Sequence, residues 1–298
     1  MKLSEWFWLL ILSFLWATSF FLVKLGLAEL TPLGLTLLRI GFAALFLLVG
    51  AIWSGEKFPT SLSTWRDFLA MGVLNNLIPF SLVALAQTQI TSGLAAILNA
   101  TTPVFTVVMA HFLIKGEHLT IWRSLGILFG LLGVGILVGI DLVKGLSLQS
   151  LGQIAVLGAA FSYACAGIYG QRLRQYSALS SATGMLFSGA MVMIPIAMFG
   201  NSHFFFAQSF PTMKVQLAII GLGFSTAMTY ILYFKLLAKV GSANLMLSTF
   251  LVPVSALLLG TVFLAEKLAW NELVGMTLIF VGLLGIDGRL LISIRKNL

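Results

Sequence analysis

The stretch Ile97–Leu113, ILNATTPVFTVVMAHFL, has a counterpart 150 residues further along the chain, at Leu247–Phe263, LSTFLVPVSALLLGTVF. Each stretch is a continuous apolar run that contains one proline, Pro103 in the first and Pro253 in the second. The match places the fourth apolar run of the chain on the ninth. It therefore indicates an internal repeat of five apolar runs.

Apolar runs of this length follow one another along almost the whole sequence. The chain is 59% hydrophobic and 9% charged, whereas a soluble domain is about one quarter charged. The runs are each about 20 residues long and continuously apolar, which is typical of bilayer-spanning helices and not of barrel strands. We therefore predict an all-α integral membrane protein. Its ten transmembrane helices are expected at Trp6–Gly26, Pro32–Ile52, Asp67–Thr88, Gly93–Ile114, Trp122–Ile140, Leu151–Tyr169, Leu179–Gly200, Lys214–Leu236, Ala243–Leu264 and Glu272–Leu290.

The distribution of lysine and arginine predicts the orientation. With the N-terminus inside, 12 of the 17 basic residues fall at cytoplasmic helix ends, as the positive-inside rule requires. Ten spans then place both termini in the cytoplasm. Five spans per repeat is an odd number, so the second repeat enters the membrane inverted, and the aligned Glu117 and Glu266 fall on opposite faces.

We predict a first repeat over residues 1–146 and a second, inverted repeat over residues 147–298. Inverted repeats are typical of alternating-access transporters, whose substrate site lies near the membrane midplane between the repeats. The alternative is that apolar helices resemble one another merely because they share Leu, Val and Gly.

The composition also bears on the chemistry of the chain. The single Cys165 lies within a span, which excludes an intramolecular disulfide and a cysteine-based metal site. Neither a Walker loop nor a paired-carboxylate metal motif is visible, so we expect no catalytic residues, no metal and no cofactor. The net charge of +8 follows the orientation of the spans, and we expect no nucleic-acid partner. A polytopic membrane enzyme is the alternative of another class.

Several motifs resemble the EamA-type branch of the drug/metabolite transporter superfamily. They are Trp16-Ala17-Thr18-Ser19-Phe20 with Lys24, Leu38-Arg39, Thr102-Pro103-Val104 followed by Gly116-Glu117, and Pro253-Val254 with Ala265-Glu266-Lys267. One departure is Leu186, which stands in the second half where the first has Arg39. The resemblance, which extends to the bacterial aromatic amino-acid exporters of that branch, implies a multi-pass transporter of the bacterial inner membrane. It further implies that small organic metabolites, amino acids in particular, are exported.

Two cations lie within the spans, where a charge needs a partner, water or a ligand. Lys24 is near the outer end of the first span; it either extends to the outer headgroups or faces a cavity. Arg39 is deeper and always protonated. It either stabilises the outer half by binding backbone carbonyls, or binds a substrate carboxylate with its planar fork.

Neutral polar groups gather before three prolines, Pro79, Pro103 and Pro253, which are predicted helix kinks, and aromatic side chains lie at mid-depth in other spans. Proline removes a backbone donor and leaves a carbonyl one turn earlier without its partner. Such carbonyls are tolerated where they line a cavity or are bonded by a neighbour, and a kink satisfied by local Ser or Thr is the alternative. The residues that we predict to bind the substrate are Trp16, Asn75, Asn76, Asn99, Tyr163, Tyr230 and Ser248.

All nine carboxylates fall in loops or near helix ends. Proton-driven transporters generally place a titrating group at depth, so we expect alternating access without a midplane carboxylate that couples protons. The aromatic and amide groups fit a zwitterion with an apolar side chain, including aromatic amino acids. A carrier or exchanger for sugar-phosphates or nucleotide sugars would require several deep cations and is the main alternative.

Small-residue spacings, such as Gly126–Gly130 in the fifth span, allow helices to approach closely. We expect these faces to pack within the bundle of a monomer, and a dimer is the alternative. The expected partners are a small-molecule substrate and the lipid bilayer.

Overall fold

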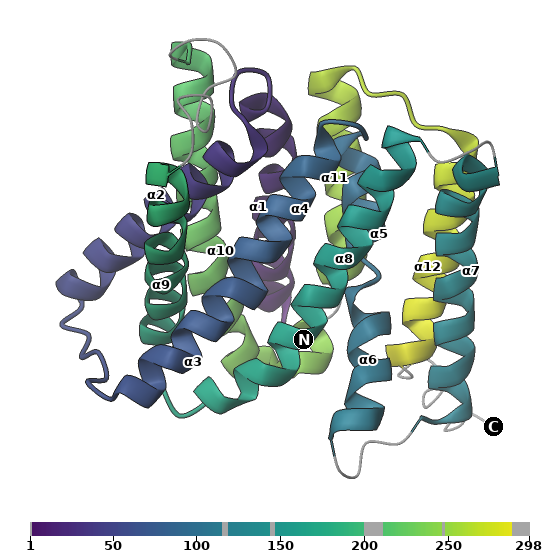
Figure 1. The fold of residues 1–298 in the computed structure, drawn as a ribbon. Coiled ribbons are helices and arrows are strands. Elements are labelled where there is room, and N and C mark those ends of the chain that lie inside the picture. Colours follow the sequence, from purple (N-terminus) through teal and green to yellow (C-terminus); the bar gives the residue numbers. More distant parts are fainter. Residues whose placement is uncertain (1, 115–118, 144–146, 200–210, 246–247, 288–298) are drawn as a thin grey trace.

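The computed structural model describes the whole chain except residues 1, 115–118, 144–146, 200–210, 246–247 and 288–298 (Figure 1). The described residues are almost entirely helical. In the first half the elements are α1 (Leu3–Gly26), α2 (Pro32–Trp53), α3 (Leu62–Gly72), η1 (Val73–Leu77), α4 (Ile78–Gln87), α5 (Ser92–Asn99), α6 (Thr102–Leu113) and α7 (Ile121–Val143). In the second half they are α8 (Leu148–Tyr169), η2 (Gly170–Leu173), α9 (Ala178–Phe199), α10 (Met213–Leu245), α11 (Ser248–Leu264) and α12 (Trp270–Asp287).

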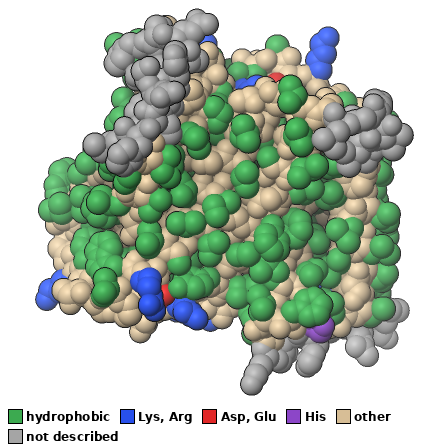
Figure 2. Space-filling model, in the orientation of Figure 1, with side chains coloured by type: hydrophobic (Ala, Val, Ile, Leu, Met, Phe, Trp, Pro, Cys, Tyr) green, Lys and Arg blue, Asp and Glu red, His purple; other side chains and the backbone are tan. Residues whose placement is uncertain are grey.

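The elements make ten membrane spans, because α3, η1 and α4 form one span and α5 and α6 form another. Among the described residues eight spans are long and apolar enough to cross a bilayer, and α11 and α12 are shorter apolar helices. Hydrophobic side chains cover the middle of the face seen in Figure 2, and Lys and Arg lie near its upper and lower edges. The predicted ten-helix membrane fold is confirmed.

Two regions of the predicted span boundaries were wrong. The third span begins at Leu62 and not at Asp67, and the boundary between the eighth and ninth spans is displaced. Helix α10 continues to Leu245, nine residues past the predicted end at Leu236, and α11 begins at Ser248 instead of Ala243. The sequence suggested a loop because Lys235 and Lys239 follow the apolar run. The helix continues because its apolar face does: Leu236 and Leu245 are both buried against Leu12 of α1.

The three predicted kinks differ in the structure. Pro103 stands in the first turn of α6, after a break at Ala100 and Thr101 that separates it from α5. Pro79 stands in the first turn of α4, directly after the π-helical turn η1. Pro253, in contrast, lies inside α11 without interrupting it. The two aligned prolines therefore do not act alike, and only the first-repeat helix is broken.

The contacts between helices have the pattern expected of two related halves: each helix and its equivalent in the other half pack against equivalent partners. Helix α1 packs against α10 and α11, and its equivalent α8 packs against α4, α5 and α6, which are the equivalents of α10 and α11. Likewise α2 packs against its own equivalent α9, and α7 packs against α12. Two repeats related by an approximate two-fold axis give this pattern. Because each repeat has five spans, the second repeat is inverted in the membrane relative to the first.

The glycine faces lie between α7 and α12, which run side by side at one edge of the bundle (Figure 1). A methyl group added at Gly126 would lie 2.5 Å from the carbonyl oxygen of Gly282, and one at Gly133 would lie 2.7 Å from that of Gly275. Backbones can approach this closely only where side chains are missing. The glycine spacing of the sequence is thus used for packing inside the chain.

Candidate functional site

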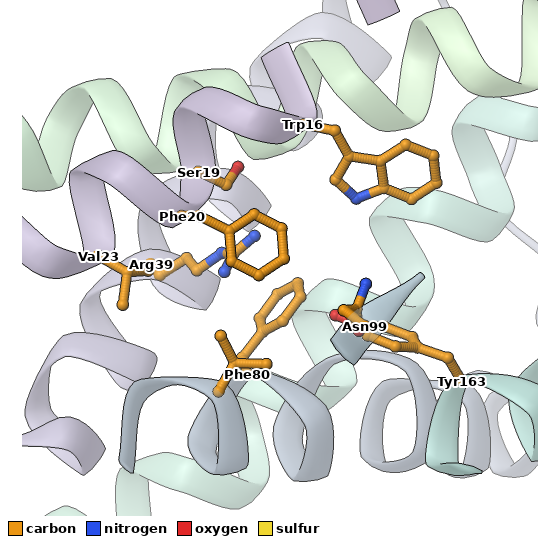
Figure 3. A pocket seen from close by; sticks show the side chains of 9 residues that line it. Trp16, Ser19, Phe20, Val23, Arg39, Phe80, Asn99 and Tyr163 are labelled. Carbon is orange, nitrogen blue, oxygen red and sulfur yellow. The ribbon is translucent and has the colours of Figure 1, made fainter. Parts of the chain in front are cut away.

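A pocket opens among α1, α2, α4, α5 and α8, between the two repeats (Figure 3). Its cavity volume is about 20 Å³, far below the range for small-molecule sites, about 300–1,000 Å³. A solute therefore requires that the lining side chains move apart. The lining residues are Trp16, Ser19, Phe20, Val23, Arg39, Phe80, Val83, Asn99 and Tyr163.

The one charged side chain of this lining is Arg39. It is only 7% exposed, and its guanidinium carbon lies 3.6 Å from the centroid of the Phe80 ring. Its Nε donates to Thr226 Oγ1 at 3.1 Å. Within the described residues no carboxylate pairs with it and no acceptor binds its two terminal NH₂ groups. Figure 3 shows the guanidinium among the side chains that line the pocket.

Thr226 fixes the direction in which the guanidinium points. The hydroxyl of Thr226 donates its single proton to the carbonyl oxygen of Leu222 at 2.7 Å. Its lone pairs are therefore left to accept from Arg39 Nε. Because Nε is bound from the side of α10 and the guanidinium stacks on Phe80, the two terminal nitrogens remain for the pocket.

Aromatic rings and one amide form most of the remaining wall. The Trp16 indole meets Tyr233 edge to face, with 6.0 Å between ring centroids, and it reaches the pocket from the middle of α1 (Figure 3). Tyr163 enters from α8 on the opposite side, and Asn99 comes from the last turn of α5. The Oδ1 atom of Asn99 is buried and has no hydrogen-bond partner among the described residues. The pocket thus contains an unpaired donor group and an unpaired acceptor.

Lys24 lies outside the lining, one helical turn outward from Phe20. Its Nζ donates to the backbone carbonyls of Gln87 at 2.6 Å and of Ile90 at 2.9 Å, at the end of α4. Its charge also interacts with Glu266. Lys24 thus binds backbone groups of the protein in this structure.

Glu266 anchors the same region from the second repeat. It accepts from Ser92 N and Ser92 Oγ, both at 2.8 Å, and from Gly93 N at 3.3 Å, at the N-terminus of α5. A carboxylate is favourable at this end of a helix. We call Lys24, Glu266 and the groups that they bind the outer clasp. It joins α1, α4, α5 and the α11–α12 connection above the pocket.

Asn75, Asn76 and Tyr230 form a separate group beside the pocket, which we call the amide–tyrosine cluster. Asn75 Nδ2 donates to the Tyr230 hydroxyl at 2.8 Å, and this hydroxyl donates to Asn76 Oδ1 at 2.6 Å. Tyr230 comes from α10, whereas both asparagines are in the π-helical turn η1. The cluster links the two repeats.

The structure therefore divides the residues predicted from the sequence. Trp16, Arg39, Asn99 and Tyr163 meet at the pocket, and Asn75, Asn76 and Tyr230 meet next to it. Ser248 belongs to neither group: its hydroxyl donates to the carbonyl of Leu245 at 2.7 Å, at the start of α11.

Five lining residues were not predicted from the sequence as site residues: Ser19, Phe20, Val23, Phe80 and Val83. These side chains are mostly apolar, as are most others in the spans, so their type gives no signal. The available signal is helical spacing: on α1 they share one face with Trp16. Within the described residues no group of three or more His, Cys, Asp or Glu side chains is placed to hold a metal ion.

A family model described as the EamA-like transporter family matches the chain twice, over residues 3–139 and 150–286. A solved crystal structure, described only as that of a protein, has a TM-score of 0.68 to this chain at 19% identity. The match covers 98% of this chain and 99% of that one. This likeness concerns the fold alone.

Three relatives extend over most of the chain. The probable amino-acid metabolite efflux pump of Salmonella typhimurium is 28% identical, covering 95% of this chain and 94% of its own. The uncharacterized inner membrane transporter YedA of Escherichia coli is 28% identical, covering 88% and 83%. The uncharacterized transporter YoaV of Bacillus subtilis is 22% identical, covering 91% and 92%.

Proposed function

The chain belongs to the EamA-like transporter family, and we propose that it exports amino acids, aromatic ones included, across a bacterial inner membrane. The family is the one that the sequence motifs resemble. As a member of a transporter family the chain is a membrane transporter and not an enzyme. It therefore acts on a small-molecule substrate within the lipid bilayer.

The observation that carries the proposal is the state of Arg39. A buried charge without a counter-ion is strongly unfavourable, yet this guanidinium turns two NH₂ groups toward the pocket with no described partner. A carboxylate of the solute supplies the missing acceptor and accepts two parallel hydrogen bonds from the guanidinium fork. The proposed role of Arg39 is thus substrate binding.

The other lining residues suit the rest of an amino acid. The unpaired Oδ1 of Asn99 accepts from the α-ammonium group, and the faces of Trp16 and Tyr163 attract the same cation. The rings of Phe20 and Phe80 provide an apolar wall for the side chain of the solute.

The charge of the site disfavours the alternative solutes. Sugar-phosphates and nucleotide sugars carry more negative charge than one guanidinium balances. The second cation, Lys24, is engaged in the outer clasp, where it binds two backbone carbonyls. A solute with one carboxylate matches the single free cation of the pocket.

The relatives support the same reading. The efflux pump of Salmonella typhimurium and a protein of the same name from Escherichia coli, which is 26% identical, are both described as probable amino-acid metabolite efflux pumps. YedA is described as an inner membrane transporter. These names motivate the substrate class and the membrane that we propose.

The proposed mechanism is alternating access by rocking of the helix bundles. The outer clasp closes the outer end of the pocket, and its rupture opens that end. The break at Ala100 and Thr101, between α5 and α6, provides a place for the backbone to bend. No carboxylate lines the described pocket, so we propose exchange or facilitated diffusion without a carboxylate proton couple at this site.

Uptake of labelled amino acids into proteoliposomes tests the proposal, with and without a pH gradient and with unlabelled solute inside. We expect saturable uptake of aromatic and other apolar amino acids that does not respond to the pH gradient. Trp16→Ala and Asn99→Ala should abolish it in protein that still folds, and Ser248→Ala, outside the pocket, should not. Full transport by both pocket variants would contradict the proposed site. Uptake of anionic metabolites without amino acids would contradict the substrate class.

A further inference from the structure

In the orientation that the basic residues predict, the amide–tyrosine cluster lies on the cytoplasmic side of the pocket. Asn76 precedes the pocket residue Phe80 by four positions on the same span, about 6 Å along the helix axis. On α10, Tyr230 follows Thr226, the partner of Arg39, by four positions and so lies on the same face. The cluster therefore lies between the cytoplasmic end of the bundle and the pocket.

One donor in the cluster has no partner. Asn76 is fully buried, at 0% exposure, and its Nδ2 has no hydrogen-bond partner among the described residues. The network explains why the donor is left over. Asn75 donates to the Tyr230 hydroxyl, the hydroxyl donates its only proton to Asn76 Oδ1, and the two N–H bonds on Asn76 Nδ2 remain. An unsatisfied buried donor costs about 1–3 kcal/mol, so a ligand with an acceptor is favoured there.

The backbone around Asn76 is also unusual. The turn Val73–Leu77 is π-helical, a form that frequently occurs at functional sites. The second repeat holds this turn in place: Ser162 of α8 donates to the carbonyl of Leu74 at 2.7 Å, and Tyr230 of α10 binds both asparagines. A movement between the repeats therefore changes the cluster directly.

We propose that the amide–tyrosine cluster is an inner subsite, in which Asn76 Nδ2 binds the carboxylate of the solute before Arg39 does. This inference rests on the proposed function. A neutral amide binds a carboxylate more weakly than a guanidinium does. Transport requires sites that are strong enough to accept a solute and weak enough to release it. The carboxylate thus passes from the weaker, neutral donor Asn76 to the stronger, charged donor Arg39, in the direction from the cytoplasm to the pocket.

The experiment compares the two faces of the membrane in oriented proteoliposomes. The solutes are phenylalanine and 2-phenylethylamine, which has the same ring and ammonium group but no carboxylate. The variant is Asn76→Leu, which removes the orphan donor and substitutes an apolar side chain of similar size. Gln87→Leu is the matched control, because it removes another buried amide of the same span whose side chain has no described partner and lies outside the pocket lining and the cluster. Asn76→Ser provides a second, smaller replacement.

We expect Asn76→Leu to raise the half-saturating phenylalanine concentration about fivefold at the cytoplasmic face, the effect of one lost hydrogen bond. The half-saturating concentration should change by less than about twofold for phenylalanine at the outer face, for the amine at either face, and for both solutes in the control variant. A change of this size is within the effect of a minor repacking. Asn76→Leu removes the unpaired Nδ2 donor but also the acceptor of the Tyr230 hydroxyl, so the melting temperature of the solubilised variant should stay close to that of wild type.

Equal shifts at both faces, equal shifts for acid and amine, or no shift would each overturn the inner subsite. Asn76→Ser must give the same sided effect, and a failure to do so also overturns it. The proposed function is tested separately by Arg39. If an Arg39 variant loses discrimination for the acid while Asn76 variants behave as wild type, the subsite alone is wrong. If neither residue affects discrimination, the proposed amino-acid site is wrong.

Discussion

Lys24 and Arg39 are two cations on neighbouring helices of one apolar bundle, and their surroundings are opposite. Lys24 is half-buried and binds the carbonyls of Gln87 and Ile90, with Glu266 close by. Arg39 is more deeply buried, and its terminal nitrogens have no described partner. The cation of the outer clasp thus has its hydrogen-bond acceptors within the protein, whereas the terminal nitrogens of Arg39 are left for a solute.

The difference teaches that the partners of a charge, and not its depth, separate structural cations from binding ones in this protein. A satisfied charge stabilises the folded bundle, and its removal exposes its partners. An unsatisfied buried charge destabilises the bundle, and its removal costs function only. Stability and transport measurements should therefore respond in opposite ways to changes at the two residues.

Arg39→Leu should produce the largest effect. We expect transport of phenylalanine to fall by about 100-fold, because loss of one partner from a buried charged pair costs about 2–5 kcal/mol. Stability should be unchanged or higher, since the variant removes an uncompensated buried charge. Uptake assays and thermal unfolding in detergent measure both quantities. A large loss of stability would instead assign Arg39 a structural role.

Lys24→Met should show the reverse pattern. We expect a loss of about 3 kcal/mol in stability, because two charge-assisted hydrogen bonds disappear and two carbonyls lose their donor. The half-saturating concentration of the folded fraction should stay within about twofold of wild type. Lys214→Met is the control: Lys214 is exposed, so its loss should leave thermal unfolding unchanged. A raised half-saturating concentration for Lys24→Met, with normal stability, would make Lys24 a binding residue.

Glu266→Gln sharpens the role of the outer clasp. The amide keeps one acceptor oxygen for the N-terminus of α5 but loses the charge and the second acceptor, so we expect a loss of about 1–2 kcal/mol in stability. The outer end of the pocket should also open more often. In a Cys165→Ser background, a Val23→Cys probe at the pocket wall should react faster with a thiol reagent added outside. Unchanged reactivity of the Val23→Cys probe would show that the outer clasp does not control access to the pocket from outside.

Thr226→Val should have the smallest effect. The isosteric change removes the acceptor for Arg39 Nε, so the guanidinium turns more freely, and we expect the half-saturating phenylalanine concentration to rise about threefold. Thr226→Ser retains the hydroxyl and should behave as wild type. If valine and serine give the same kinetics, Thr226 does not position Arg39.

The fold could be predicted from the sequence because its determinants are long and periodic. Continuous apolar runs predicted the spans, and the basic residues together with the repeat predicted their arrangement. The boundary between α10 and α11 was missed because Lys235 and Lys239 lie on a helix whose leucine face continues past them. A charge marks a loop only where the apolar face also ends.

The site was predictable where a polar or aromatic residue stands out at mid-depth, as Trp16, Asn99 and Tyr163 do. Its apolar half was not, because nothing in the residue types distinguishes Phe20 or Val83 from other apolar residues of the spans. The roles of the two cations were left open for a further reason. Which carbonyls lie within reach of Lys24 depends on packing between α1 and α4, which the local sequence does not encode.

The most direct test of the account is the selectivity between phenylalanine and 2-phenylethylamine in wild type and in Arg39→Gln, with uptake of each solute measured in proteoliposomes. Glutamine keeps polar donors at the site but has neither the charge nor the fork. We predict that wild type prefers the acid by about 100-fold, the effect of a bidentate charged pair, and that the variant loses this preference. The same preference for the acid in the variant would contradict the account.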